Sequence, residues 1–512
     1  MENKSLNKES SRWHYLTAIV IMLSSYLIFS DLRYESLWFD EGYTYAVSQL
    51  PLDKLTVPFD VHPPLFYIIE SFFVKNDGNE ATLRLPAALA GIFSVIIVYI
   101  IANNLFGSRG AFISTMYIGL SFAHITYSAN ARNYTLLLFF FFIACAALAK
   151  IYQNCINDDW PKRKSNQLLI LYFLSCTACL YTHNISVIYL LVLNIVILVF
   201  SALNWNRLKK KYITGYILLN ILIFICWLPW LSVLIGTSDA FGWLTQPSII
   251  LAAKQFLGIT KLNHAPLWLS IPTLLGLAIA CIYALIKSDD SSKIIIITTL
   301  IGIPLAVFGV GYIKPMYMER TILTVLLGIS LCLGFFVSNI RGKIMPLVII
   351  GFFTISSAIF AFNYHNRVPT EETIAGKISQ DWRSAVGSSD TDEAFIANHN
   401  SIPTISFYLK DGQKMFLYDN EELIPVTLDN WNEYFSQPIK QRRAAGSISF
   451  TEFLRNGQKN SELLSNKSIT MIEIKILNQL NTPIHDFLLR NGYVLKETVD
   501  LVGLKLYRYN LH

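Results

Sequence analysis

Residues 86–105, Pro-Ala-Ala-Leu-Ala-Gly-Ile-Phe-Ser-Val-Ile-Ile-Val-Tyr-Ile-Ile-Ala-Asn-Asn-Leu, form an apolar run without a charged side chain. About 20 such residues in a helix reach across the hydrocarbon core of a bilayer. Similar runs recur along the chain of 512 residues, which is 53% hydrophobic and 15% charged. A soluble domain usually carries about 25% charged residues. The sequence therefore predicts a polytopic α-helical membrane protein.

About eleven transmembrane helices are predicted from these runs. The third and fourth are short or closely spaced, so they could be tilted or re-entrant. The predicted spans are 14–30, 86–105, 111–126, 134–150, 168–182, 185–203, 213–234, 267–286, 294–312, 321–338 and 344–362.

The direction of each span follows from the basic residues, which gather in alternate loops such as 162–164 and 207–211. Basic loops stay on the cytoplasmic side of a membrane. We therefore read them as topology signals and predict no nucleic-acid partner. The N-terminus is predicted to be cytoplasmic, in a multi-pass protein of a bacterial cytoplasmic (inner) membrane. The predicted outer, periplasmic or extracytoplasmic segments are 31–85, 127–133, 235–266, 313–320 and everything after residue 363.

Two domains are predicted, because long apolar runs stop near Asn363 and charged residues become common. Residues 1–362 form the membrane-embedded domain, and residues 363–512 form a soluble α/β domain on the outer side. Strands are predicted at 394–397, 405–408, 468–474 and 499–507, and helices near 380–387 and 480–491. The outer segments are predicted to contain short helices in the membrane interface, because they mix aromatic and aliphatic residues with few charges: 42–50, 63–74 and 247–258.

Two adjacent carboxylates, Asp40 and Glu41, lie between aromatic residues just past the first apolar run, in Trp-Phe-Asp-Glu-Gly-Tyr. Charges in such a place are costly, so we expect them to have a function. A carboxylate within hydrogen-bond reach of a hydroxyl group can take its proton as a general base. Asp40 and Glu41 are therefore the catalytic candidates. In the structural alternative, Asp40 or Glu41 merely caps the helix that starts near Gly42. Both roles could also hold for the pair, with one residue capping and the other catalytic.

A second candidate site is Asp60-Val61-His62-Pro63-Pro64. Prolines suit the first turn of a helix, and the free N–H groups there, with His62 beside them, suit a phosphate or carboxylate. Asp60 and His62 could also share a divalent ion, although two ligands are weak evidence for a metal site. No cofactor is predicted. The structural alternative for His62 is an interfacial side chain bonded to the backbone.

Three arginines, Arg84, Arg132 and Arg320, are predicted at outer edges of the membrane, where the charge rule disfavours them. Their planar forks of donors match phosphate oxygens. Together they would bind a lipid phosphate, whereas pairing with nearby glutamates is the structural alternative. His183, at the outer end of the fifth predicted span, is either a cavity-lining residue or a packed histidine.

These segments resemble, in this order, the GT-C superfamily of glycosyltransferases. The branches with the strongest resemblance are the protein O-mannosyltransferases and the aminoarabinose and related lipid A or core transferases. Asp381-Trp382-Arg383 opens the tail as in relatives that have an outer C-terminal domain. The matching residues are Trp38-Phe39-Asp40-Glu41, His62-Pro63-Pro64-Leu65, Leu83-Arg84-Leu85-Pro86, Tyr127-Ser128 with Ala131-Arg132-Asn133-Tyr134, Tyr181-Thr182-His183, and Pro315, Tyr317 and Arg320.

The resemblance implies a sugar donor linked to polyprenyl phosphate, inversion at the anomeric carbon, and Asp40 as the base that activates the acceptor. It implies donor-phosphate contacts from Arg84, Arg132, Arg320 and His62, the last at a position where some relatives have lysine. Many relatives have an acidic residue where this chain has Asn130, so metal dependence is in doubt. The remaining predicted pocket residues are Asp60, Tyr127, Asn130, Tyr134, His183 and Tyr317.

The sequence favours an enzyme, with a polyprenyl-phosphate-linked sugar donor, membrane lipids and a glycan, lipid or protein acceptor as partners. A transporter or flippase of a lipid-linked sugar is the first alternative, and it would place ionisable residues deep within the spans. A non-catalytic membrane scaffold for envelope polysaccharide assembly is the second. The residues do not identify the sugar, the acceptor or the length of the lipid.

Overall fold

The protein is described in a computed structural model, which divides it into two compact units. The predicted span 344–362 and Asp60 lie outside the residues that the structure describes. The described residues are 2–33, 35–55, 62–74, 79–157, 162–207, 210–236, 246–260, 267–340, 381–387, 389, 393–397, 401–419, 422–435, 454, 468–474, 482–501 and 504–511.

The first unit, here called the helical unit, and the second, the α/β unit, are both discontinuous in sequence. The sequence predicts one boundary after residue 362. In the structure, the contacts between residues assign two stretches of the first predicted outer loop to the same unit as the C-terminal residues. The helical unit comprises Met1–Asp31, Val61–Phe66 and Arg84–Asn366, and the α/β unit comprises Leu32–Asp60, Tyr67–Leu83 and Arg367–His512.

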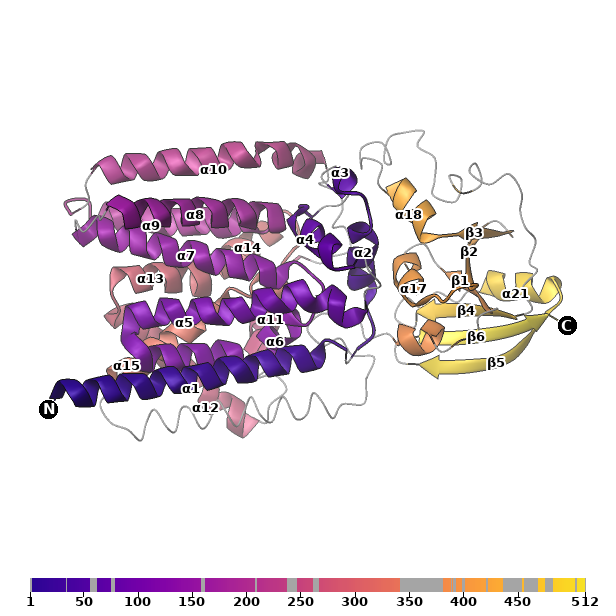
Figure 1. The fold of residues 1–512 in the computed structure, drawn as a ribbon, viewed down its shortest axis with the longest axis horizontal. Helices are drawn as coiled ribbons and strands as arrows, with labels where there is room; N and C mark the ends of the chain where they lie inside the picture. The colour runs from indigo at the N-terminus through magenta and orange to yellow at the C-terminus, as the bar shows by residue number, and fades with distance from the viewer. Residues whose placement is uncertain are drawn as a thin grey trace. The chain divides into compact units, whose positions relative to one another are not determined.

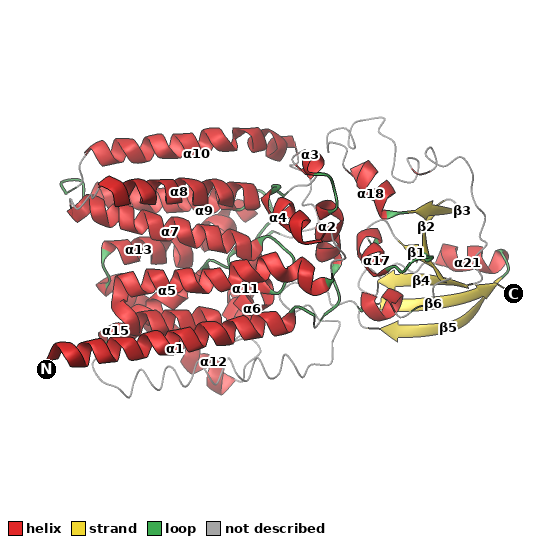
Figure 2. Cartoon of the chain, viewed as in Figure 1, coloured by secondary structure: helices red, strands yellow, loops and turns green. Residues whose placement is uncertain are grey.

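Helices that run side by side build the helical unit (Figures 1 and 2). In a bilayer no water is present to bond the backbone, so a helix is the form in which an apolar run satisfies its own N–H and C=O groups. Its elements are α1 (Glu2–Asp31), α5 (Glu80–Gly119), α6 (Phe122–Ser128), α7 (Tyr134–Asn157), α8 (Lys162–Thr182), α9 (Ser186–Leu203), α10 (Lys210–Gly236), α11 (Ile249–Thr260), α12 (Leu267–Lys287), α13 (Asp290–Ile296), the π-helix η2 (Ile297–Gly302), α14 (Ile303–Gly311), the 3₁₀-helix η3 (Glu319–Thr321) and α15 (Val325–Asn339).

The helical unit is that of a multi-pass membrane protein. Within the described part of the chain, seven helical segments are long and apolar enough to cross a membrane. Shorter apolar helices cover the predicted spans 168–182 and 321–338, at Asn166–Thr182 and Val325–Asn339. The seven are Ser10–Asp31, Glu80–Gly119, Tyr134–Asn157, Ser186–Leu203, Thr214–Ile235, Ser270–Lys287 and Asp290–Gly311.

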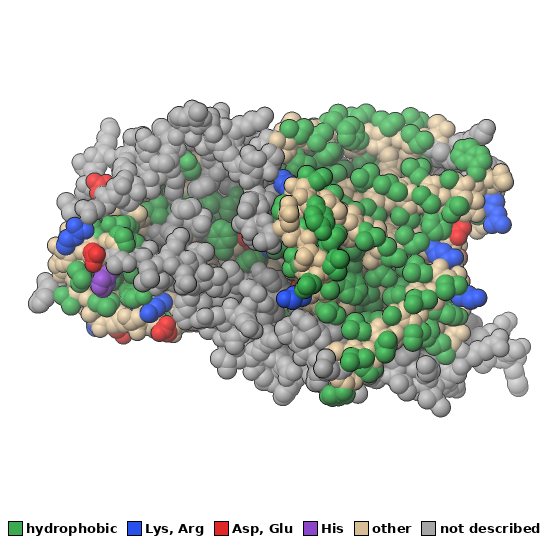
Figure 3. Space-filling model, turned by 180° about the vertical axis from the view of Figure 1, so that it is seen from behind, with side chains coloured by type: hydrophobic (Ala, Val, Ile, Leu, Met, Phe, Trp, Pro, Cys, Tyr) green, Lys and Arg blue, Asp and Glu red, His purple; other side chains and the backbone are tan. Residues whose placement is uncertain are grey.

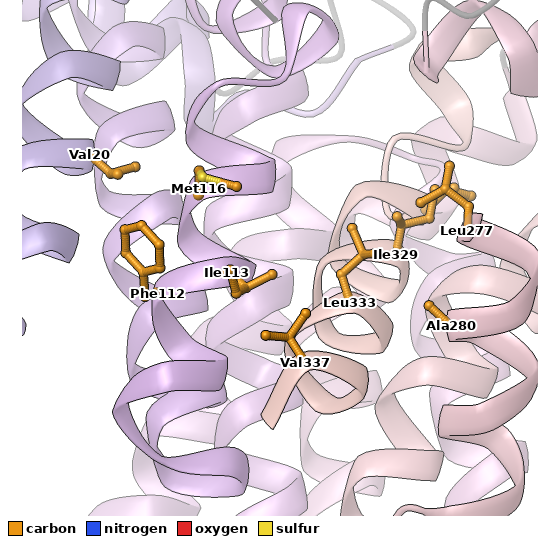
Figure 4. Close-up of a cluster of buried hydrophobic side chains, with 10 residues drawn as sticks. Val20, Phe112, Ile113, Met116, Leu277, Ala280, Ile329, Leu333 and Val337 are labelled. Carbon is orange, nitrogen blue, oxygen red and sulfur yellow. The ribbon is translucent and has the colours of Figure 1, made fainter. Parts of the chain in front are cut away.

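Apolar side chains cover the outside of the helical unit as well as its interior. Figure 3 shows a broad hydrophobic surface over these helices. Exposed residues on α12 recur every three or four positions, as on the lipid-facing side of a helix: Ile271, Leu275, Ile279, Ile282 and Ile286. Inside, one core cluster joins α1, α5, α12 and α15 (Figure 4), through residues that include Val20, Phe112, Met116, Leu277, Ile329 and Leu333.

Small residues bring α5 and α15 close together. A Cβ on Gly110 would lie 2.9 Å from the carbonyl oxygen of Gly334, and one on Gly334 would lie 2.7 Å from that of Gly110. The Ser114 hydroxyl donates to the Ser330 carbonyl at 2.8 Å. Close backbone approach through small residues is the usual means by which helices associate in membranes.

The α/β unit contains a six-stranded mixed sheet in the order β3-β2-β1-β4-β6-β5. Strand β1 pairs in parallel with β2 and β4, and the other pairs are antiparallel. Its elements are α2 (Phe39–Ser48), α3 (Leu52–Leu55), most of α4 (Leu65–Val74), η4 (Arg383–Gly387), β1 (Glu393–Ala397), α17 (Ile402–Tyr408), β2 (Lys414–Asp419), β3 (Glu422–Val426), α18 (Leu428–Phe435), β4 (Ser468–Ile474), α21 (Thr482–Arg490), β5 (Tyr493–Leu501) and β6 (Leu504–Leu511).

The predicted fold class, a polytopic membrane protein with a C-terminal α/β domain, is confirmed, and so are the helices predicted at 42–50, 63–74 and 247–258. The strand predicted at 405–408 is wrong. These residues belong to α17, where Pro403 stands in the first turn and suits a helix start. The strand predicted at 499–507 is in fact the end of β5 and the start of β6, paired as a hairpin.

The boundary between the predicted spans 86–105 and 111–126 differs in the structure. Residues 80–119 form α5, which has a kink at Gly107, where φ is 74° and ψ is 179°. α5 ends at Gly119, and α6 restarts at Phe122, so the predicted span 111–126 is interrupted. The backbone conformation of Gly107 is adopted almost only by glycine.

We predict that Gly107→Ala destabilises the protein by about 1–3 kcal/mol, the usual cost of a strained backbone at a residue with a Cβ. A Cβ at this position meets no atom within 4 Å, so the loss would come from the backbone and not from a clash. Gly276→Ala within α12 is the matched control. It also has open space, and in a regular helix alanine is favoured over glycine. Denaturant unfolding in detergent compares the two, and equal stabilities would contradict the prediction.

Candidate functional site

The helix that carries the two adjacent carboxylates, α2, begins at Phe39 and not at Gly42, so both acids lie in its first turn. Negative charge is favoured there by the helix dipole. The Glu41 carboxylate accepts a hydrogen bond from the Trp38 backbone N–H at 3.3 Å. Glu41 is fully buried and Asp40 is half-buried. The capping role left open by the sequence thus falls to Glu41, and Asp40 keeps its place at the protein surface.

Glu70, on α4, is a carboxyl that the sequence analysis missed. It is fully buried, and neither carboxyl oxygen has a hydrogen-bond partner among the described residues. Burial raises the pKa of Glu70 well above its ordinary value, and the nearby charge of Glu41 raises that pKa further. In the sequence, Glu70 is a single acidic residue within the apolar run Leu-Phe-Tyr-Ile-Ile-Glu-Ser-Phe-Phe. This pattern could have identified it, because an ionisable residue in apolar surroundings is often functional.

We predict that Glu70 makes the stability of the protein fall as pH rises. Its folded-state pKa lies above the unfolded value of about 4.3. The neutral form therefore stabilises the fold fully below that value, and this contribution is lost as pH rises through the folded-state pKa. Glu70→Gln keeps a neutral side chain of the same shape. Its melting temperature should fall less steeply toward high pH than that of the wild type.

Thermal unfolding between pH 5 and 9 in detergent tests the role of Glu70. Glu433→Gln is the control, because Glu433 is an exposed carboxylate on α18 of the same unit. The same dependence on pH in the wild type and in Glu70→Gln would contradict the prediction.

Within the helical unit, aromatic and imidazole rings from four places in the sequence meet in one cluster. His62 and His183 have ring centroids 4.8 Å apart. Tyr134 lies 5.8 Å from His183 and 5.7 Å from Tyr127 by the same measure. We call these four residues, with Arg132 and Arg320, the ring cluster.

Arginine completes the ring cluster. The guanidinium carbon of Arg320 lies 5.7 Å from the centroid of the Tyr134 ring, within the range of a cation–π contact. The charges of Arg132 and Arg320 both act on His62 and His183. The structure therefore brings together six residues that the sequence analysis singled out, each at or near the end of a helix.

Hydrogen bonds between elements hold the ring cluster in place. The Asn133 amide donates to the Thr182 carbonyl at 2.8 Å, which ties the start of α7 to the end of α8 beside His183. The Tyr189 hydroxyl on α9 donates to the Thr321 carbonyl at 2.9 Å and so fixes η3, which carries Arg320. These contacts lie between segments as far apart in sequence as α9 and η3, so only tertiary packing could reveal them.

Both histidines of the ring cluster are neutral at pH 7. Burial lowers the pKa of His62 well below its ordinary value, and Arg132 and Arg320 lower it further. The pKa of His183 falls for the same reasons, with His62 as an additional cause. The Ile185 backbone N–H donates to His183 Nδ1 at 3.0 Å. Neutral His183 therefore carries its proton on Nε2, where it can donate to a ligand oxygen.

Three further predicted site residues belong to the helical unit, namely Arg84, Asn130 and Tyr317. Arg84 is buried in α5, and its charge is not among those that act on the two histidines. Asn130 is buried and accepts from the Arg132 N–H. Tyr317 is buried with its ring 5.7 Å from that of Phe308. Asp60 is not among the described residues.

Metal ligation by Asp60 and His62 remains a prediction. In the part of the chain that the structure describes, no group of three or more His, Cys, Asp or Glu side chains is placed to hold a metal ion.

His124 on α6 is a buried histidine that the sequence analysis missed. Neither of its ring nitrogens has a hydrogen-bond partner among the described residues.

The chemistry of the ring cluster suits an anion. Two guanidinium groups supply positive charge and forked donors, and the surrounding side chains are buried or partly buried. In such surroundings hydrogen bonds to a phosphate are stronger than in water. A cluster of this kind at the ends of membrane helices can hold a lipid phosphate.

Comparison with known proteins agrees with this chemistry. The sequence model of the family described as dolichyl-phosphate-mannose-protein mannosyltransferase matches residues 61–230. An uncharacterized protein of Aquifex aeolicus (strain VF5) is 34% identical over 117 residues, which are 21% of this chain and 23% of that relative. The matched stretch thus spans about a quarter of that curated relative.

Solved structures match over nearly the whole chain. ArnT from Cupriavidus metallidurans in the apo state is 12% identical with a TM-score of 0.59, and the match covers 98% of both chains. The same protein bound to undecaprenyl phosphate is 11% identical with a TM-score of 0.57, covering 96% of this chain and 97% of that one. The archaeal oligosaccharyltransferase AglB from Archaeoglobus fulgidus, in complex with an inhibitory peptide and a dolichol-phosphate, is 11% identical with a TM-score of 0.50, covering 96% and 74%.

The fold is that of a polytopic membrane protein with a C-terminal α/β domain, and it is similar to the fold of ArnT. The resemblance to the GT-C superfamily that the sequence motifs predict is confirmed.

Proposed function

We propose that this protein is a glycosyltransferase that moves a sugar from a polyprenyl-phosphate donor to an acceptor on the outer face of the membrane. The ring cluster is the observation that carries the proposal. It gathers two arginines and two neutral histidines in the helical unit, beside the ring of Tyr134. The solved ArnT structure with this fold binds undecaprenyl phosphate.

In the proposed reaction, Arg132 and Arg320 bind the donor phosphate and stabilise the charge that develops on it as the sugar leaves. His62 and His183 donate to its oxygens, and Arg84 is a further donor contact. A phosphate leaving group is already stable as an anion and needs no general acid. One base is therefore enough, unlike the two carboxyl groups that most glycosidases use.

Asp40 is the proposed base. It takes the proton of the acceptor hydroxyl as that oxygen attacks the anomeric carbon, and the bond to the phosphate oxygen breaks with inversion. Its half-buried place in the first turn of α2 supports this role, because a base must reach both its substrate and the solvent that removes the proton. Glu41, buried and bonded to the Trp38 N–H, supports α2 instead.

The finer assignments extend the same proposal. The acceptor is a glycan, lipid or protein of the cell envelope, and the membrane is the bacterial inner membrane. The N-terminus is cytoplasmic, and both the reaction and residues 363–512 are on the outer side. The basic inner loops support this orientation.

Asp40→Asn should lower the rate by about 10²–10⁴-fold, the usual contribution of a positioned base. The assay adds purified protein to membranes of a deletion strain, which contain their own donor and acceptor, and follows the glycan product by mass spectrometry. Asp53→Asn, which changes an exposed carboxylate of α3, is the control and should keep the full rate. A wild-type rate in Asp40→Asn would rule out this residue as the base.

Arg320→Ala should weaken undecaprenyl phosphate binding by about 10–100-fold, because a hydrogen bond to a charged group contributes about 1.5–3 kcal/mol. Arg207→Ala removes an exposed arginine from a predicted inner loop and should leave the affinity unchanged. Equilibrium binding to the protein in lipid nanodiscs compares the three proteins. Equal affinities would remove Arg320 from the phosphate site.

A further inference from the structure

The segment that leads into α2 is held at three points by the C-terminal part of the α/β unit. The Leu37 backbone N–H donates to the Tyr408 hydroxyl at 2.8 Å. The Ser36 hydroxyl accepts from the Arg383 backbone N–H at 3.1 Å, and the Arg33 carbonyl accepts from the Arg383 guanidinium at 3.2 Å. Asp40 follows three residues after Leu37, so these contacts fix the start of the helix that carries it.

Glu80 joins the two C-terminal residues that hold this segment. Its carboxylate accepts from Arg383 Nε at 2.9 Å and from Arg383 Nη2 at 2.7 Å. It also accepts from the Tyr408 hydroxyl at 3.0 Å. The Glu80 side chain is only 11% exposed, so these charge-assisted bonds are stronger than a surface ion pair. Both ends of the first outer loop thus meet at one carboxylate.

Helix α2 is also packed tightly against α17. A Cβ on Gly42 would overlap the side chain of Thr404 and lie 2.9 Å from its Cα atom. The rings of Tyr45 and Phe407 meet edge to face, with centroids 5.0 Å apart. Glycine at position 42 is therefore required by the close approach of the two helices.

A second helix of the C-terminal part, α18, also contacts α2. The Tyr43 and Trp431 rings meet edge to face, with centroids 5.5 Å apart. Together, α17 and α18 contact α2 at Gly42, Tyr43 and Tyr45. The fixed start and the packed body leave α2 little freedom to move relative to the sheet-bearing part of its own unit.

We propose that Tyr408 and Arg383 are positioning residues that hold α2 so that Asp40 keeps its productive orientation. This inference rests on the proposed function, in which Asp40 is the base. It assigns a role to Asp381-Trp382-Arg383, which the sequence analysis noted without a function. Trp382 is 1% exposed and anchors this turn, and the Asp381 carboxylate accepts from the Ser36 hydroxyl at 3.4 Å. The C-terminal part is then a component of the catalytic machinery and not only a selector of acceptors.

Tyr408→Phe tests the positioning role, with Tyr418→Phe as the matched control. The Tyr418 hydroxyl donates to the Pro483 carbonyl in the same unit, so both variants remove one bonded hydroxyl from this unit. Arg383→Lys is the second variant, because it keeps the charge and loses the fork that reaches Glu80. All of them are made in the full chain in lipid nanodiscs.

Three measurements separate positioning from general damage. Hydrogen exchange of Phe39–Ser48 should become faster in Tyr408→Phe and in Arg383→Lys, but not in Tyr418→Phe. The rate on membranes of the deletion strain should fall by about 10–100-fold in the first two, since a misplacement of about 1 Å can cost 10²-fold. Their affinity for undecaprenyl phosphate should stay within about twofold of the wild type.

Wild-type exchange in α2 or a wild-type rate in both Tyr408→Phe and Arg383→Lys would overturn the positioning proposal. A lower rate together with a tenfold loss of phosphate affinity would also overturn it, because the damage would then extend beyond α2. Asp40→Asn keeps the two proposals distinct. Full activity of that variant would rule out Asp40 as the base. An inactive Asp40→Asn together with wild-type rates in both Tyr408→Phe and Arg383→Lys would overturn the positioning role alone.

Discussion

The absence of water in the bilayer interior is the constraint on which this protein depends. Backbone groups there must bond to one another, so the apolar runs become helices. Charged side chains are costly at that depth. In the ring cluster, His62, Arg132, His183 and Arg320 therefore lie at or beside helix ends. The same constraint that produces the bundle thus agrees with the position of these charged and polar groups at helix ends.

Burial then sets the properties of those groups. The pKa values of His62 and His183 are lowered by desolvation and by two neighbouring arginines, so the imidazoles are neutral partners for an anion instead of additional cations. Glu70 shows the opposite case, a carboxyl whose pKa burial raises. Asp40, by contrast, is half-buried, so acids of the same unit differ strongly in their access to water.

The α/β unit shows how a discontinuous unit can hold a short helix. An isolated ten-residue helix such as α2 is marginal in water. Contacts with α17 and α18 supply the tertiary support that it needs, and the Tyr408 hydroxyl holds the segment that leads into it. A substitution in the C-terminal part can therefore alter the region around Asp40 without touching the ring cluster.

The sequence by itself determined the membrane class and most spans, because apolar length is a local property. Misplaced charge singled out Arg132 and Arg320, whereas Tyr127 and Tyr134 were singled out only through the family resemblance. The sequence also located β1, β4 and α21, whose residue types agree with their structure. It failed at 405–408, where Pro403 and packing against α2 favour a helix over the strand that the residue types suggest. Only the tertiary structure decided that the rings of His62 and His183 lie in contact and that Glu80 binds Arg383. These pairings join residues up to 303 positions apart, and such contacts follow from how the chain packs and not from any local pattern.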